Sequence, residues 1–226
     1  MLLEEAEWIG ETLNRLPAQS ISPCINLGAS TRTLREIKQP YTVEKVLAPL
    51  SARNIKIVHS DIKSGEGIDV AGDIYDARVQ MRLAAFRPRL ILCTNILEHL
   101  RDPGGFARAC SAILAPEGYI LVSVPRSYPY HPDPIDTLFR PSPEEIATLF
   151  PGFTSISSGI VTCKTYLGEI ARGRTTPAIA KRIVRDMIRT FVPFIKFRGW
   201  MSQVHRYRWL FRPYEVSVVL LGRGTA

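Results

Sequence analysis

Acidic side chains follow two short apolar segments of the chain, at the points where each segment ends. Asp61 follows the segment Ile55–Ser60, and Asp73 follows the segment Ile68–Gly72. One carboxylate at such a position can accept hydrogen bonds from ribose hydroxyl groups, and a second can meet the amino group of an adenine. Aspartate is also frequent in turns and caps, and this explains either residue taken alone. Their joint placement favours a nucleoside site.

A bend of small residues lies in the stretch CINLGAST, which covers residues 24–31. Gly28 allows the backbone to come close to a ligand there. A nucleotide-binding loop usually has further glycines, whereas this chain continues with Ala29, Ser30 and Thr31. The stretch therefore has two interpretations at this point: a cofactor loop with few glycines, or an ordinary turn from a strand into a helix.

Side chains that can accept a proton follow two later segments. Glu98 and His99 lie in the stretch NILEHL of residues 95–100, and His131 follows Tyr128–Tyr130. Neutral histidine is available near pH 7 and can act as a general base, which takes a proton from a reacting group. We predict His131, Glu98 and His99 as catalytic candidates. In the structural alternative, His131 holds a proline-rich loop in place, and Glu98 and His99 orient their own loop and bond backbone amides.

Two further acids, Asp133 and Asp136, are also candidate bases. They are near enough to His131 in sequence to share a metal ion with it, but no clear ligand set is present and we predict no metal. We expect Arg140 to pair with an acid rather than to contact a substrate, although its guanidinium suits an anionic sugar or phosphate.

Apolar segments that alternate with amphipathic ones must position these side chains. Such alternation indicates an α/β fold, a mostly parallel sheet with helices on both faces, whose ligands lie at the carboxyl ends of the strands. The last two strands would pair at one edge. The predicted strands are residues 24–27, 55–59, 68–72, 90–93, 119–124, 156–163 and 215–221. The predicted helices are residues 4–16, 76–86, 102–114 and 142–150, with a short helix at most over residues 31–37.

The composition indicates a single domain over residues 1–226. Of its 226 residues, 46% are hydrophobic, and the mean hydropathy is +0.02. Four isolated cysteines are expected to be reduced and mostly buried, and the first residues lack the pattern of a signal peptide. No apolar run approaches the roughly 20 residues that span a bilayer. These features favour a cytoplasmic protein.

The net charge of +8 is concentrated in one segment. Residues 171–212 contain eleven basic residues and one acid, a net charge of +10, so the remainder of the chain is slightly acidic. Because these cations alternate with bulky apolar residues, we expect residues 181–212, within an insertion over residues 166–213, to contact an anionic membrane surface. In the commoner alternative, the apolar stripe packs on the sheet and the cations are solvated. RNA binding ranks lower because no RNA-binding module accompanies the segment, so nucleic acid is not an expected partner.

Four stretches, taken in order, resemble class I S-adenosylmethionine-dependent methyltransferases. They are NLGAS, HSDIKSGEGIDVAGDIYD, LILCTNILEHLRDP and ILAPEGYILVSVP, and the resemblance covers about residues 24–153. The stretch YPYHPDPIDTLFRPSPEEIATLF is similar to a subgroup associated with cell-surface glycan synthesis, and a linker with barely one helix between Gly28 and Asp61 also suits that subgroup. The resemblance implies a seven-stranded Rossmann-like fold and S-adenosylmethionine as methyl donor. This donor has no pyrophosphate that demands several backbone amides, so a loop with few glycines is compatible with it.

The resemblance also implies roles for the residues at the strand ends. Asp61 would bind the ribose, and Asp73 with Ile74 beside it would lie at the adenine. Asn95 and Ile96 would border the sulfonium. The methionine part of the donor would lie against Asn26, Gly28, Ala29 and Ser30.

We therefore expect a methyltransferase that acts on a hydroxyl group of a saccharide or a related small molecule. If this acceptor is lipid-linked, the basic segment would hold the protein at the inner face of the cell membrane as a peripheral protein. One alternative is an RNA or protein methyltransferase, which the basic segment alone supports. A second alternative is a non-catalytic, methyltransferase-like binding or scaffold protein, which the low glycine count of the bend supports.

Overall fold

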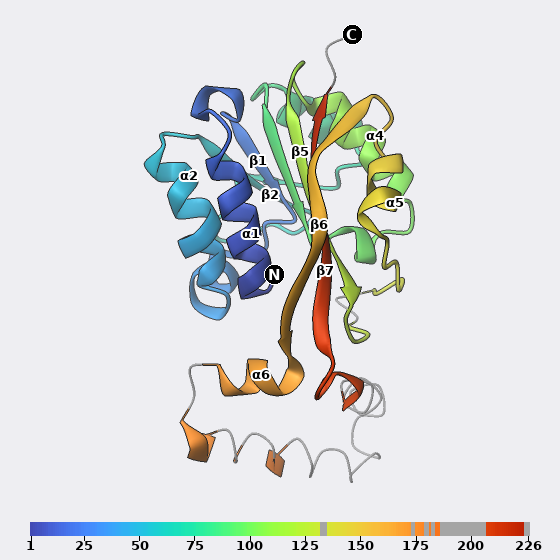
Figure 1. Cartoon of the computed structure of the whole chain (residues 1–226). Coiled ribbons are helices and arrows are strands. Elements are labelled where there is room, and N and C mark those ends of the chain that lie inside the picture. The colour runs from blue at the N-terminus through green and yellow to red at the C-terminus, as the bar shows by residue number, and fades with distance from the viewer. Residues whose placement is uncertain (132–134, 173–174, 179–180, 182–183, 186–206, 224–226) are drawn as a thin grey trace.

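A computed structural model describes residues 1–131, 135–172, 175–178, 181, 184–185 and 207–223. These residues contain a seven-stranded sheet with the strand order β3-β2-β1-β4-β5-β7-β6 (Figure 1). All pairs from β3 to β5 are parallel, and β7 runs antiparallel to both of its neighbours. The predicted Rossmann-like fold is confirmed. Its strands are β1 (Cys24–Leu27), β2 (Ile57–Asp61), β3 (Val70–Ala71), β4 (Leu90–Thr94), β5 (Tyr119–Ser127), β6 (Phe153–Thr165) and β7 (Pro213–Arg223).

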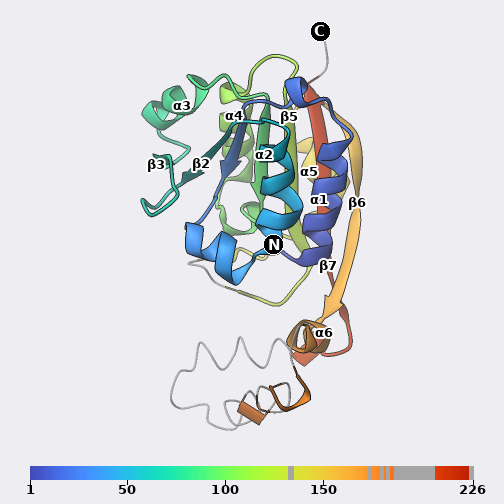
Figure 2. The same cartoon turned by 90° about the vertical axis from the view of Figure 1, so that its left-hand side faces the viewer.

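Helices cover both faces of the sheet (Figures 1 and 2). On one face, α1 (Leu3–Asn14) and α2 (Ala48–Ala52) pack their apolar side chains against the central strands. The other face carries α3 (Ala77–Ala84), α4 (Pro103–Ile113) and α5 (Pro143–Thr148). Because the central strands β1 and β4 are buried on both faces, their sequences CINL and LILC are continuously apolar or nearly so.

Capping side chains fix where three of these helices begin. Asp76 accepts a hydrogen bond from the backbone N–H of Arg78, and Asp102 accepts one from the N–H of Gly105. Ser142 opens a capping box on α5. A side-chain oxygen in this position satisfies an N–H group that has no partner within the helix.

The linker between β1 and β2 contains more helix than predicted. Residues Leu34–Lys38 form one helical segment, and residues Val43–Leu47 form a second that continues into α2. The prediction of barely one helix is wrong because Pro49 lies in the first turn of α2, where a missing N–H is tolerated. Gly10 permits close contact with this segment, since a Cβ at residue 10 would lie 2.1 Å from the carbonyl oxygen of Lys45. The linker therefore no longer supports the resemblance to the glycan-associated subgroup.

The predicted insertion lies between β6 and β7. It begins with α6 (Tyr166–Ala171) and ends with a helical turn at Tyr207–Trp209, where the indole of Trp209 donates a hydrogen bond to Ser127 Oγ at 3.0 Å. Most of the basic segment 181–212 lies outside the described residues, so the expected amphipathic helix within it stays a prediction. Since β6 is antiparallel to β7 and β7 to β5, the insertion leaves the sheet at the same edge as the carboxyl ends of the parallel strands.

All four cysteines are free and buried, as predicted. Within the part of the chain that the structure describes, no helix has the length and apolar character that crossing a bilayer would require.

Candidate active site

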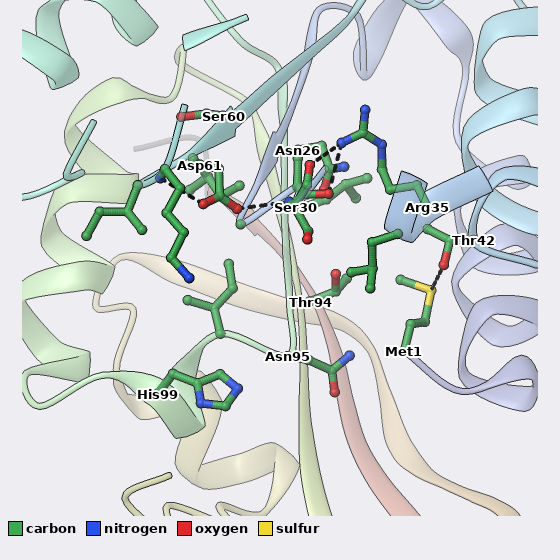
Figure 3. A pocket seen from close by; sticks show the side chains of 18 of the residues that line it. Met1, Asn26, Ser30, Arg35, Thr42, Ser60, Asp61, Thr94, Asn95 and His99 are labelled. Carbon is green, nitrogen blue, oxygen red and sulfur yellow. Dashed lines mark hydrogen bonds between the residues drawn. The ribbon is translucent and has the colours of Figure 1, made fainter. Parts of the chain in front are cut away.

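A cavity of about 820 Å³ opens at the carboxyl ends of the parallel strands. This position is the expected ligand site of a sheet of this type, and the volume suits a cofactor. The predicted donor residues all line it: Asn26, Gly28, Ala29, Ser30, Asp61, Asp73, Ile74, Asn95 and Ile96. Figure 3 shows several of them turned toward one another from three neighbouring strand ends. The predicted convergence of the two carboxylates and the bend on one hollow is therefore confirmed.

The bend after β1 has a left-handed backbone at two positions. Gly28 has a φ of +61° and Ser30 a φ of +54°. A Cβ at residue 28 would lie 2.9 Å from two carbon atoms of Ile96, so glycine is required both for the backbone angle and for space. The loop keeps its cavity-facing shape with a single glycine because other groups hold it.

Arg35 is the side chain that holds this loop. Its guanidinium is almost fully buried and donates hydrogen bonds to the carbonyl oxygens of Ala29, Ser30 and Gly67, at 3.0 Å to Ala29 and 2.9 Å to Gly67. Charge-assisted bonds of this kind are among the stronger hydrogen bonds in proteins. The sequence analysis missed Arg35, and one arginine in a short polar helix carries no signal that distinguishes it.

The two strand-end carboxylates are both bonded to backbone N–H groups. Asp61 accepts from Ser30 N at 2.9 Å and from Lys63 N at 3.0 Å, and Asp73 accepts from Tyr75 N at 3.0 Å. The turn and capping role of these acids is therefore real. It does not exclude a ligand, because an ionised carboxylate has about four acceptor positions and these bonds use two at Asp61.

A hydrogen-bonded pair, Asn26 and His59, lies at the donor end, and Asn26 lines the cavity there. Asn26 Nδ2 is 3.2 Å from Nδ1 of His59. Burial, with Arg35 nearby, lowers the pKa of His59 to about 4, so its imidazole is neutral at pH 7. A neutral Nδ1 can accept the amide hydrogen of Asn26 and thereby orient it toward the cavity. The sequence analysis did not identify His59.

Met1 and Leu2, which precede α1, line one wall of the cavity, and Glu5 of α1 fixes Asn95. Glu5 is fully buried, and its Oε1 accepts hydrogen bonds from Asn95 Nδ2 at 2.7 Å and Ser123 Oγ at 2.6 Å. Its Oε2 accepts one from Leu2 N at 2.8 Å. This support was also missed, although Glu5 has helical i+4 spacing with two buried apolar residues, Ile9 and Leu13, which places it on the buried face.

The three predicted catalytic side chains lie together at the other end of the cavity. His99 and His131 line it, and both Nε2 atoms face the carboxylate of Glu98, at 3.7 Å and 3.8 Å from its Oε1. Glu98 is fully buried and neither of its carboxylate oxygens has a hydrogen-bond partner among the described residues. Burial raises the pKa of Glu98 to about 8, against a smaller opposing effect of its own backbone N–H.

The histidines are held by their second nitrogens. His99 Nδ1 bonds the carbonyl oxygen of Ile135, which confirms its loop-orienting role. His131 Nδ1 is 3.1 Å from the carbonyl oxygen of Pro129, and burial lowers the pKa of His131. Whether these residues take part in catalysis stays a prediction.

Asp136 also supports His131. It accepts a hydrogen bond from the backbone N–H of His131 at 3.0 Å, and its Oδ2 is 3.2 Å from Nδ1. Arg140 binds both carboxylate oxygens of Asp136, at 3.0 Å and 2.7 Å, which confirms the predicted pairing with an acid. Although burial opposes it, these hydrogen bonds lower the pKa of Asp136 to about 2. Asp133, the other candidate base, lies outside the described residues.

Comparisons with known proteins agree with this geometry. Residues 14–154 match the model of a family described as a methyltransferase domain. A ubiquinone biosynthesis O-methyltransferase from Bordetella pertussis is 28% identical over 120 residues, which are 51% of this chain and 46% of that protein. The matched stretch thus spans about half the length of that relative.

Solved structures share the fold at low sequence identity. A coclaurine N-methyltransferase bound to N-methylheliamine and SAH has a TM-score of 0.53 and 12% identity, covering 96% of this chain and 69% of that one. The [4+2]-cyclase SpnF has a TM-score of 0.52 and 10% identity, covering 97% and 81%. Since one of these neighbours is named as a cyclase, the fold alone does not give the reaction.

Proposed function

The chain belongs to the methyltransferase-domain family, and we propose that it is a methyltransferase dependent on S-adenosylmethionine that methylates a hydroxyl oxygen of a saccharide or a related small molecule. The observation that carries this proposal is the arrangement within the cavity. Carboxylates and a backbone bend lie at one end, and two imidazoles beside a buried carboxylate lie at the other.

The donor end fits S-adenosylmethionine in its shape and chemistry. In this proposal Asp61 accepts the ribose hydroxyl groups, Asp73 meets the adenine, and the cavity beside the bend at Gly28 admits the methionine part. When bound, the donor supplies an electrophilic methyl group on a sulfonium, and the S–C bond breaks as an O–C bond forms, with the electron pair left on sulfur. Arg35 and Glu5 support this end by fixing the loop and Asn95 before the ligand arrives.

The histidine end suits an acceptor that must lose a proton. His131 faces the cavity, and its lowered pKa leaves a neutral imidazole that can take the hydroxyl proton at pH 7. The name of the Bordetella relative, an O-methyltransferase, supports oxygen as the methylated atom. A lipid-linked acceptor is a further part of the proposal, supported by the basic insertion leaving the sheet at the cavity's edge.

Titration calorimetry with S-adenosylhomocysteine tests the donor site. Asp73→Asn removes a cavity-lining carboxylate, whereas Asp76→Asn changes a nearby acid that caps α3 and does not line the cavity. We expect Asp73→Asn to weaken binding about tenfold, or 1.4 kcal/mol, and Asp76→Asn to leave it unchanged. No binding by the wild-type protein at millimolar ligand would overturn the proposal and favour a scaffold protein.

The acceptor class needs a second experiment. The enzyme is incubated with donor that carries a deuterated methyl group and with separate panels of saccharides, lipid-linked saccharides, RNA and protein. Mass spectrometry then locates the label. We expect it on a hydroxyl oxygen of a saccharide or related small molecule, and label on RNA or protein alone would establish the rival function.

A further inference from the structure

The side chain of Glu98 is buried without a hydrogen bond from any described residue to either of its carboxylate oxygens. It has 0% exposure, and neither Oε1 nor Oε2 has a hydrogen-bond partner in the described part of the chain. An ionised carboxylate is costly to bury in this state, so buried carboxyl groups are normally neutral, paired or bound to a metal. Arg140, the nearest cation that affects it, has both of its bonded nitrogens on Asp136. The described residues therefore provide no hydrogen-bond donor for the Glu98 oxygens.

Two imidazoles surround this carboxylate. One ligand atom each from Glu98, His99 and His131 can be chosen so that all three lie within 4.8 Å of one another. The Nδ1 atom of each imidazole lies at hydrogen-bond distance from a main-chain carbonyl oxygen, and its Nε2 atom faces Glu98. The three atoms therefore face a common point, and both imidazoles also line the cavity.

The outer contacts of the histidines are those that metal-bound histidines normally have. The carbonyl oxygen of Ile135 contacts Nδ1 of His99, and the carbonyl oxygen of Pro129 contacts Nδ1 of His131. A carboxylate oxygen of Asp136 also lies 3.2 Å from His131 Nδ1. Such contacts fix the tautomer that leaves Nε2 free to coordinate, and they raise its basicity. Arg140 in turn holds Asp136 in place.

We propose that Glu98, His99 and His131 bind a divalent first-row transition metal ion, with Zn²⁺ as the reference ion, at the acceptor end of the cavity. Two imidazoles and one carboxylate are a known ligand set for such an ion, and catalytic sites keep a further position open. Ligands of a tetrahedral Zn²⁺ lie about 3.4 Å apart, so the observed 3.7 Å and 3.8 Å require small side-chain movements. This site differs from the sequence prediction of no metal, because 32 positions separate His131 from His99 and the folded loop brings them together.

The open position of this site faces the cavity where the proposed function places the acceptor. A hydroxyl oxygen bound to the cation has a lowered pKa and loses its proton to solvent more readily. The resulting oxyanion then attacks the methyl carbon, and the imidazoles act as ligands instead of as a free base. This role rests on the proposed function, whereas the binding of the cation does not.

Zinc binding to the full chain tests the site directly. Protein is stripped with a chelator, dialysed and titrated with Zn²⁺ in competition with a chromophoric chelator, and its melting temperature is measured with and without Zn²⁺. Glu98→Gln and His131→Gln remove one ligand each, and Glu117→Gln is the matched control, since Glu117 is exposed and does not line the cavity. We expect one equivalent of Zn²⁺ to bind the wild type and the control and to raise both melting temperatures. Each ligand variant should bind at least about 100-fold more weakly.

The stripped proteins separate metal binding from misfolding. Without metal, Glu98→Gln should melt at or above the wild-type temperature, because it keeps the size of the side chain and removes a buried carboxyl group that accepts no hydrogen bond from the described residues. No stoichiometric binding by the wild type, or binding that both ligand variants keep, would overturn the site. S-adenosylhomocysteine binding is measured on the same samples. If the wild type does not bind S-adenosylhomocysteine, the proposed function is refuted. If it binds S-adenosylhomocysteine but not Zn²⁺, only the metal site is refuted.

Discussion

Replacing Gly28 with alanine tests whether the bend after β1 requires a residue without a side chain at this position. The substitution places a methyl group on a backbone with a φ of +61° and 2.9 Å from Cγ1 and Cδ1 of Ile96. The substitution has two separate free-energy costs: one for the left-handed backbone and one for the contact with Ile96. Gly152 offers a matched control, since its φ is +83° and a Cβ there would have no neighbour within 4 Å.

The magnitudes of the two costs can be estimated separately. A left-handed backbone costs an alanine about 1–2 kcal/mol, and the smaller entropy of its unfolded chain returns about 0.4–1 kcal/mol. Gly152→Ala should therefore lower the free energy of unfolding by about 1 kcal/mol. Gly28→Ala adds the overpacking against Ile96, typically 1–3 kcal/mol, so its total should be about 3 kcal/mol.

Urea unfolding and calorimetry with S-adenosylhomocysteine measure both consequences. Gly28→Ala should also weaken ligand binding about tenfold, because Ile96 lines the cavity and must move, whereas Gly152→Ala should leave binding unchanged. Adding Ile96→Val, which removes Cδ1, should recover part of the lost stability. If Gly28→Ala and Gly152→Ala have equal effects on stability and neither changes binding, the steric account of this bend is wrong.

Three further predictions concern other parts of the molecule. His59 has a folded-state pKa of about 4 through burial and through Arg35, below its ordinary 6.5, so the unfolded chain binds the proton more tightly and stability falls as the pH drops from 6.5 toward 4. Because the ring is partly exposed, the loss between pH 7 and pH 5 should be about 1 kcal/mol, and urea unfolding of His59→Gln should lack it. Arg140→Met leaves Asp136 buried and unpaired and should cost about 3 kcal/mol in urea unfolding, most of which Asp136→Asn in the same chain restores. Replacing Arg182, Arg185 and Arg189 of the insertion with glutamate should abolish flotation of the protein with anionic liposomes. The control replaces three exposed basic residues elsewhere, Lys38, Arg78 and Arg101, and should still float. Equal binding of the two variants to the liposomes would refute membrane contact.

The sheet was predictable because its signals are local. Continuous apolar runs such as residues 90–93 indicate strands that are buried on both faces, and the capping residues before α4 and α5 fix where those helices begin. The helical linker after β1 was not predictable in the same way. Its segment at Val43–Leu47 is stabilised by packing on α1 at Gly10, a contact between residues far apart in sequence.

The residues of the candidate site also differ in whether local sequence signals predict them. Residues at strand ends, such as Asp61 and Asp73, follow from the rule that ligands of parallel sheets lie at the carboxyl ends. Arg35 and His59 act through tertiary contacts with the bend and with Asn26, and their spacing in the sequence carries no trace of these partners. Sequence reasoning thus identified the groups that face the cavity better than the groups that hold them.

Two buried glutamates with opposite surroundings distinguish structural from functional burial in this molecule. Glu5 and Glu98 both have 0% exposure, and both lie behind residues that line the cavity. Glu5 accepts hydrogen bonds on both oxygens, so its burial is explained by the wall that it builds with Asn95. Glu98 accepts none, and a carboxyl group at that position contributes nothing to stability that a leucine would not exceed. What a leucine lacks is a carboxyl group beside two oriented imidazoles, and the proposed metal ion would bind this group in its ionised form.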